Sequence, residues 1–109
     1  MHFTSYLQDR QLTVALTGEI DHHCAKEYMQ HISEKIESYT PSVCVLDFQE
    51  VTFMDSSGIG LILGRVRTAA LWGGHVTVRG LSPQLKKMAE LSGVSALAVL
   101  EDAGKGAKT

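Results

Sequence analysis

The stretch from residue 53 to 60 constrains the fold more than any other part of the sequence. An apolar run ends there at Asp55 and two serines, and a second apolar stretch with helical spacing follows at once. This order is typical of a β-strand that leads into an α-helix. A short polar side chain at such a junction accepts a hydrogen bond from an unpaired N–H group of the first helical turn. Either Asp55 or Ser56 is therefore a candidate N-cap.

The residues before this junction predict a hairpin and a helix. Residues 3–8 alternate partly between polar and apolar, and residues 11–17 alternate clearly, with two residues between them for a turn. Gly18 is expected to end the second strand. A helix is then predicted from about residue 22 to 38, with Asp21 as its N-cap. The expected core face of this helix is Ala25, Tyr28, Met29, Ile32 and Ile36.

Two strands are expected directly before the junction. Residues 43–48 are apolar apart from Asp47, include two β-branched valines and do not alternate, which is typical of a central strand with a parallel neighbour. A polar link at residues 49–50 separates them from the second run at 51–54.

The helix after the junction is predicted from about residue 57 to 71. Its core stripe is expected to be Ile59, Ile62, Leu63, Val66 and Ala70. Arg65 and Thr68 are expected away from that stripe. Leu61 also falls outside it, so we expect an exposed apolar side chain near Ser56.

The remaining elements are shorter. Residues 75–79 alternate as a strand. Ser82 and Pro83 begin a third helix, as a capping serine followed by a proline in the first helical position. Residues 96–100 are apolar and predict a last strand. The inward face of the third helix is expected to be Leu85, Met88, Ala89 and Leu91.

This order of elements predicts an α/β protein with a mixed sheet of four or five strands and three or four packed helices. Right-handed crossovers bring the ends of parallel strands to one edge, so the loops at 18–21 and 54–57 should meet there. We expect residues 1–100 to form a single domain and residues 101–109 a flexible tail, which is small, charged and glycine-rich.

Composition and charge argue against several classes of partner. The formal net charge is −2 and the basic residues are scattered, so we expect no nucleic-acid partner. No apolar run approaches the roughly 20 residues that cross a bilayer, and no secretory signal is evident. The expected location is the cytoplasm, with no membrane partner. The two cysteines are predicted to be reduced thiols.

Three kinds of chemistry receive little support. Ser56 is not in a Gly-x-Ser-x-Gly elbow, and no single histidine among residues 22, 23 and 75 is marked as its base. The glycines from Gly58 to Gly64 do not match a dinucleotide loop, and no Walker pattern occurs. His22, His23 and Cys24 are consecutive, so in a helix they point about 100° apart and do not converge on a metal ion. No cofactor and no metal are expected.

A modified serine at the junction remains as a hypothesis. A phosphate on Ser56 would lie at the positive end of a helix dipole, where anions are tolerated. Spacing alone leaves the simpler alternative open, in which the serine is only a helix cap.

Two segments and two residue pairs carry a resemblance to a known family. Residues 17–23 (Thr-Gly-Glu-Ile-Asp-His-His), residues 53–65 (Phe-Met-Asp-Ser-Ser-Gly-Ile-Gly-Leu-Ile-Leu-Gly-Arg) and the pairs at 82–83 and 92–93 resemble the anti-sigma F factor antagonists, STAS-domain proteins of spore-forming bacteria. The resemblance covers about residues 3–100 and implies the STAS fold.

The resemblance implies a regulator that is itself a substrate, with no catalytic residues. Its unphosphorylated form is expected to bind the anti-sigma factor and serine kinase SpoIIAB and so to release sigma F. The kinase is expected to phosphorylate Ser56, and the phosphatase SpoIIE to remove the phosphate. The partner-binding residues implied by position are Asp21, Asp55, Ser56, Ser57, Gly58 and Leu61.

Two alternative functions stay open. The first is an antagonist in a general-stress sigma factor pathway, although the His-His after Asp21 and the Ser-Ser-Gly favour the sporulation pathway. The second is a nucleotide-binding or hydrolytic domain that uses Ser56.

Overall fold

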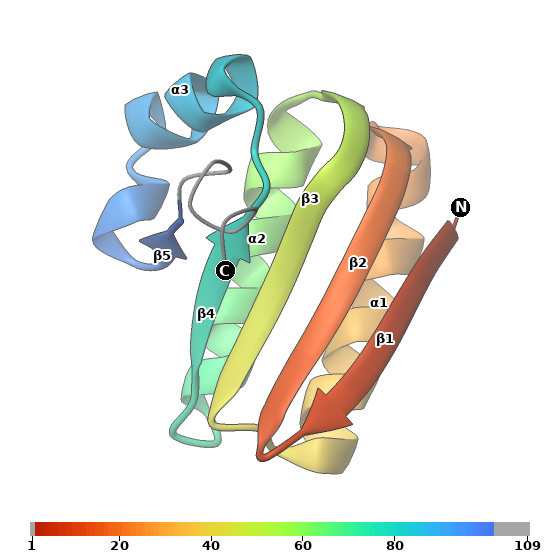
Figure 1. The fold of residues 1–109 in the computed structure, drawn as a ribbon, viewed down its shortest axis with the longest axis vertical. Coiled ribbons are helices and arrows are strands. Elements are labelled where there is room, and N and C mark those ends of the chain that lie inside the picture. Colours follow the sequence, from red (N-terminus) through yellow and green to blue (C-terminus); the bar gives the residue numbers. More distant parts are fainter. Residues whose placement is uncertain (1, 102–109) are drawn as a thin grey trace.

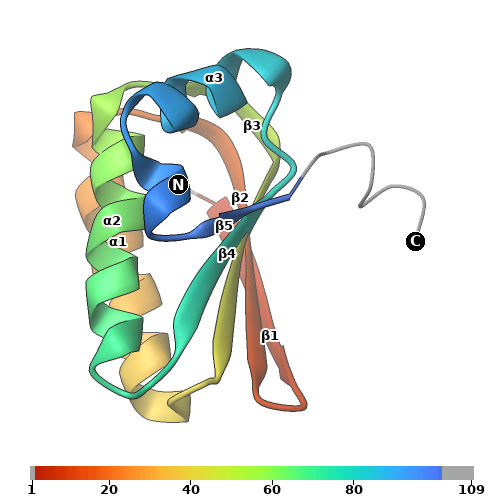
Figure 2. The same cartoon turned by 90° about the vertical axis from the view of Figure 1, so that its left-hand side faces the viewer.

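The computed structural model describes residues 2–101, with the side chain of His2 left out, so nearly all of the tail predicted at 101–109 lies outside the described residues. The described chain forms a five-stranded sheet in the order β1-β2-β3-β4-β5. Helices α1 and α2 cover one face of this sheet, and α3 lies at one end of it (Figures 1 and 2). The elements are β1 (His2–Gln8), β2 (Gln11–Ile20), α1 (His22–Tyr39), β3 (Val43–Met54), α2 (Ser56–Ala70), β4 (His75–Arg79), α3 (Pro83–Leu91), the 3-10 helix η1 (Val94–Ala96) and β5 (Val99–Leu100).

The predicted fold class is confirmed, as a mixed five-stranded sheet with three α-helices. Strand β1 pairs antiparallel with β2, and the other neighbours are parallel. The core lies between the sheet and the two long helices, where Leu12, Val14 and Leu16 of β2 are fully buried. Because β2, β3 and β4 run the same way, their carboxyl ends lie at one edge of the sheet.

The predicted hairpin is present, and its two-residue turn has an unusual backbone. Asp9 and Arg10 both have positive φ, 51° and 63°, as a type I′ turn requires. The Arg10 side chain also binds the loop between α1 and β3. Its Nε donates to the Ser42 Oγ at 3.0 Å and its Nη2 donates to the Thr40 carbonyl at 3.1 Å.

Two predicted strand boundaries are wrong. Gly18 does not end β2; it has a φ of 81° at an irregularity in the β2–β3 register, and the strand continues to Ile20. Gln49 and Glu50 do not separate two strands, because β3 runs without a break from Val43 to Met54. In both places the chain absorbs a local bulge instead of turning away.

The core stripe predicted for α2 is rotated from the true one. The buried residues are Gly58, Ile59, Leu61, Ile62 and Ala69, while Ala70 is exposed. Leu61, expected at the surface, is fully buried. Arg65 lies on this same inward side, and its Nε and Nη1 atoms are buried without a hydrogen-bond partner among the described residues.

The third helix begins as predicted. The Ser82 Oγ accepts from the Leu85 N–H at 3.2 Å, and Pro83 occupies the first turn. Leu85 and Ala89 are buried, but Leu91 is 80% exposed, so its predicted inward position is wrong. The last strand is much shorter than expected, because residues 94–96 form η1 before the two residues of β5 pair with β4.

Candidate functional site

Two aspartates lie side by side at the carboxyl ends of β2 and β3. Ile20 and Met54 are paired in the parallel register, and the Asp55 N–H donates to the Ile20 carbonyl at 3.2 Å. Asp21 therefore follows β2 at the place where Asp55 follows β3. The prediction that the two loops meet at one edge is confirmed.

Each aspartate is the N-cap of the helix that follows it. The Asp21 Oδ1 accepts from the His23 N–H at 2.9 Å and from the Cys24 N–H at 3.2 Å, which begins α1. The Asp55 Oδ1 accepts from the Ser57 N–H at 2.8 Å, which begins α2. Of the two cap candidates at the junction, the structure therefore selects Asp55.

Ser56 is the first residue of α2, and its side chain is free of any capping role. It is exposed, whereas Asp55 and Ser57 on either side are half-buried. Within the part of the chain that the structure describes, no hydrogen bond of the Ser56 hydroxyl is found. The hydroxyl is thus available to solvent at the amino end of a fifteen-residue helix.

Two of the residues expected in the docking surface lie inside the protein. Gly58 is buried, and a Cβ atom there would overlap with the Cγ and Sδ atoms of Met54. Leu61 is fully buried in the core. The expectation that Leu61 is exposed is wrong because the inward side of α2 is centred near Gly58, Leu61 and Arg65. Neither residue offers a side chain to a partner.

An exposed aromatic residue was not foreseen at this edge. Phe53, two residues before Asp55, has 49% of its surface exposed, and it is paired in register with the exposed Glu19 of β2. The sequence offered a signal, since Met54 next to it had to point toward the core and side chains alternate along a strand.

The electrostatics of the edge favour an ionised Asp21. The pKa of Asp21 lies below its usual value mainly because the Cys24 N–H donates to it, and the His23 N–H acts in the same direction. The Cys24 thiol donates to the Glu19 carbonyl at 3.0 Å. The fixed N–H groups of α1 therefore stabilise negative charge on Asp21 beside Ser56.

Among the described residues, no hydrogen bond joins Ser56 to a histidine, as a hydrolytic arrangement would require. His75 begins β4 and is paired with Val43, at the opposite end of β3 from Ser56. The rings of His22 and His23 stack on each other with centroids 4.1 Å apart. Among residues 2–101 no group of three or more potential metal ligands converges.

No helix in this range is long and apolar enough to cross a membrane.

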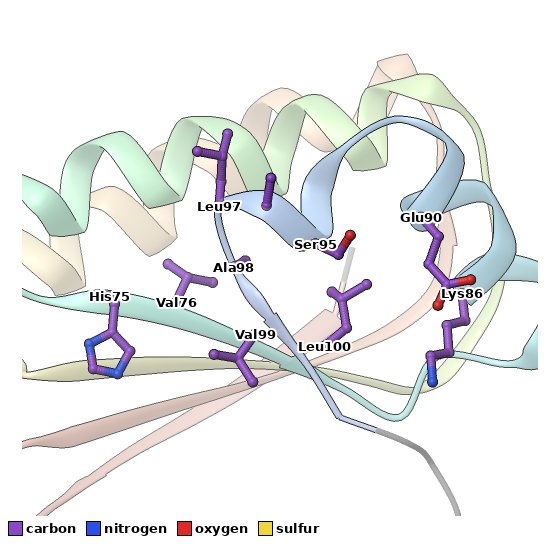
Figure 3. A pocket seen from close by; sticks show the side chains of 10 residues that line it. His75, Val76, Lys86, Glu90, Ser95, Leu97, Ala98, Val99 and Leu100 are labelled. Atoms are coloured by element: carbon purple, nitrogen blue, oxygen red, sulfur yellow. The ribbon is translucent and has the colours of Figure 1, made fainter.

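A cavity of about 500 Å³ lies elsewhere, between α3, η1 and the β4–β5 edge (Figure 3). Val76 and Ala98 are among its apolar lining residues, and Lys86 and Glu90 lie at one end. It includes neither Ser56 nor the glycines at the start of α2, so it does not support a nucleotide site at the junction.

Comparison with known proteins identifies the family. Residues 3–103 match the STAS domain. An anti-sigma F factor antagonist of Lysinibacillus sphaericus is 34% identical over 95 residues, which are 86% of this chain and 81% of the relative. An anti-sigma-B factor antagonist of Listeria monocytogenes is 29% identical over 87 residues, 77% of this chain and 73% of the relative. The protein belongs to the STAS-domain family.

Two solved structures of the anti-sigma factor antagonist SpoIIAA have the same fold. The unphosphorylated form superposes with a TM-score of 0.79 at 28% identity, covering 96% of this chain and 92% of that chain. The phosphorylated form from Bacillus superposes with a TM-score of 0.72 at 27% identity, covering 98% and 97%. The resemblance deduced from the sequence motifs is therefore confirmed.

Proposed function

We propose that this protein is an anti-sigma factor antagonist that is switched by phosphorylation of Ser56. The unphosphorylated form binds an anti-sigma factor that is also a serine kinase, which releases the sigma factor in the cytoplasm. The protein is a substrate and a regulator in this scheme, not an enzyme. The observation that carries the proposal is an exposed serine, free of the helix cap, in a chain similar to antagonists that exist in both unphosphorylated and phosphorylated forms.

The geometry explains how this site would tolerate a phosphate. Asp55, not Ser56, holds the first turn of α2, so modification of the serine breaks no hydrogen bond of the fold. The positive end of the helix dipole favours an anion there. The phosphate adds about −1.5 to −2 charges close to Asp21 and Asp55, and a partner that buries this edge would have to desolvate all of them.

The partners follow from the same proposal. The kinase is the anti-sigma factor of the sigma F pathway, SpoIIAB, and the phosphatase is SpoIIE. Asp21, Asp55, Ser56 and Ser57 form the surface that the kinase contacts, while Gly58 acts through close packing beneath it and Leu61 through the core. A second candidate pathway is the general-stress one, because the chain also resembles anti-sigma-B factor antagonists.

The test is to incubate the protein with each candidate kinase of the same organism and ATP, and to locate the phosphate by mass spectrometry. We expect one phosphate on Ser56 with the sigma F kinase, and none in Ser56→Ala. Phosphate on Ser57, or on no serine with any of the kinases, would contradict the assignment. Turnover of ATP or GTP by the protein alone would support the hydrolytic alternative instead.

A further inference from the structure

Phe53 is an exposed aromatic residue beside the proposed phosphorylation site, and neither the core nor the helix cap uses it. Its neighbour Met54 is 1% exposed and packs inward, whereas Phe53 is 49% exposed. Ser56 is three positions further along the chain, so the Cα atoms of the two residues are at most about 10.5 Å apart. This distance is short enough for one partner to cover both residues.

The same edge concentrates negative charge. Residues 18–23 and 49–60 contain four carboxylates and no lysine or arginine, although the whole chain has a formal net charge of only −2. Glu19 and Glu50 are exposed, and Asp21 and Asp55 are half-buried. An apolar ring surrounded by carboxylates is complementary to an apolar pocket with a basic rim.

We propose that Phe53 is the anchor of the docking surface and inserts into an apolar pocket of the anti-sigma factor kinase that is rimmed by arginine or lysine. This inference rests on the proposed function and names the group that supplies the affinity. A few buried aromatic residues commonly dominate the binding energy of an interface, and surrounding charges mainly set the rate and the specificity of association.

The anchor also resolves an electrostatic difficulty. A phosphate should be attracted to a basic partner, so charge alone does not explain why phosphorylation releases it. With Phe53 seated in an apolar pocket, the phosphate on Ser56 lies at the margin of a desolvated contact, where burial of a dianion is unfavourable. Phe53 and Ser56 should therefore be coupled: the penalty for a negative charge at Ser56 should shrink when the anchor is removed.

The chain offers a matched control for an exposed aromatic residue. Trp72 is 51% exposed, close to the value for Phe53, but it lies just after α2, at the opposite end of that helix from Ser56. Isolated exposed aromatic residues are common on protein surfaces. If Phe53 were only such a residue, the Phe53→Ala and Trp72→Ala variants would behave alike.

The experiment measures binding of the same organism's anti-sigma factor kinase, in the presence of ADP, by calorimetry. Phe53→Ala should weaken binding about 30-fold or more, since an anchor contributes about 2 kcal/mol, whereas Trp72→Ala should stay within about threefold of wild type. Phe53→Leu, which keeps an apolar side chain, should retain most of the affinity. Unfolding by urea should give similar midpoints for the wild type and all three variants, which excludes misfolding as the cause.

Two outcomes have different meanings. Wild-type-like binding by Phe53→Ala, with Ser56 still phosphorylated by the kinase, would overturn the anchor and leave the proposed function intact. A wild-type protein that neither binds the kinase nor is phosphorylated by it would overturn the proposed function itself. Equal losses from Ser56→Glu in the wild-type and Phe53→Ala backgrounds would overturn the coupling.

Discussion

The structure places two strand–aspartate–helix units side by side, β2–Asp21–α1 and β3–Asp55–α2, and they differ in the residue that comes directly after the aspartate. Both aspartates cap their helices through backbone N–H groups. In the first unit the next residue is His22, at the start of a helix with a polar outer face. In the second it is Ser56, an exposed hydroxyl that the cap does not need. Capping alone thus does not distinguish the two units; the unused hydroxyl beside the second cap does.

The first prediction challenges this difference by placing a charge at the same position of each unit. Ser56→Glu should weaken binding of the anti-sigma factor kinase about 100-fold, equivalent to about 2.8 kcal/mol, because the carboxylate enters the contact. His22→Glu puts the same charge at the first residue of α1 and should have a clearly smaller effect. Titration calorimetry measures both. Equal losses would show that the partner senses the charge of the whole edge and not the serine position.

The second prediction concerns the close packing of Gly58 against Met54 in the second unit. Gly58→Ala should lower the free energy of unfolding by about 2 kcal/mol, because the new Cβ overlaps with the buried Met54 side chain. Gly64→Ala, on the same helix with no atom within 4 Å of the new Cβ, should raise it by about 0.5–1 kcal/mol through helix propensity. Urea unfolding distinguishes the two. Stabilisation by both substitutions would contradict the packing described for Gly58.

The third prediction concerns the strand under α2. Burial raises the pKa of the Cys44 thiol from 9.0 to about 12. Because the folded-state pKa is raised, this thiol contributes stability that is fully present below about pH 9 and is lost as the pH rises toward 12. At pH 10 this contribution to the free energy of unfolding should be about 1 kcal/mol smaller than at pH 7. The decrease should be absent in Cys44→Val.

The measurement is urea unfolding of both proteins at pH 7 and pH 10. In the native wild type, Cys44 should also resist alkylation at pH 8, and it should react once urea unfolds the chain. Rapid alkylation of Cys44 in the folded protein would contradict its burial.

Much of the fold could be predicted because local signals agreed with one another. The alternation in β1 and β2, the Asp21 cap and the Ser82-Pro83 start each indicated a single element, and each was confirmed. The stripe of α2 could not be predicted, because this helix is apolar on several sides and more than one set of residues has helical spacing. Its inward side includes Gly58, which packs against Met54 of β3, and the spacing of apolar residues does not reveal that a glycine is buried.

The candidate site was predictable in part for the same reason. Asp21 and Asp55 were placed at one edge by the handedness of the crossovers, and the structure confirms this. Phe53 was missed because the alternation of side chains along β3, which turns Met54 inward and Phe53 outward, was not followed to the end of the strand. Leu61 was misplaced together with the rest of its helix face.

The cap formed by Asp55 has a consequence for the life of the protein in the cell. Under the proposed function, phosphate is added to and removed from a side chain on which no hydrogen bond of the fold depends. Both forms should then unfold at similar rates and be degraded at similar rates. One molecule can pass through many rounds of modification. The relative activities of kinase and phosphatase then change the phosphorylated fraction of the protein and leave its total amount unchanged.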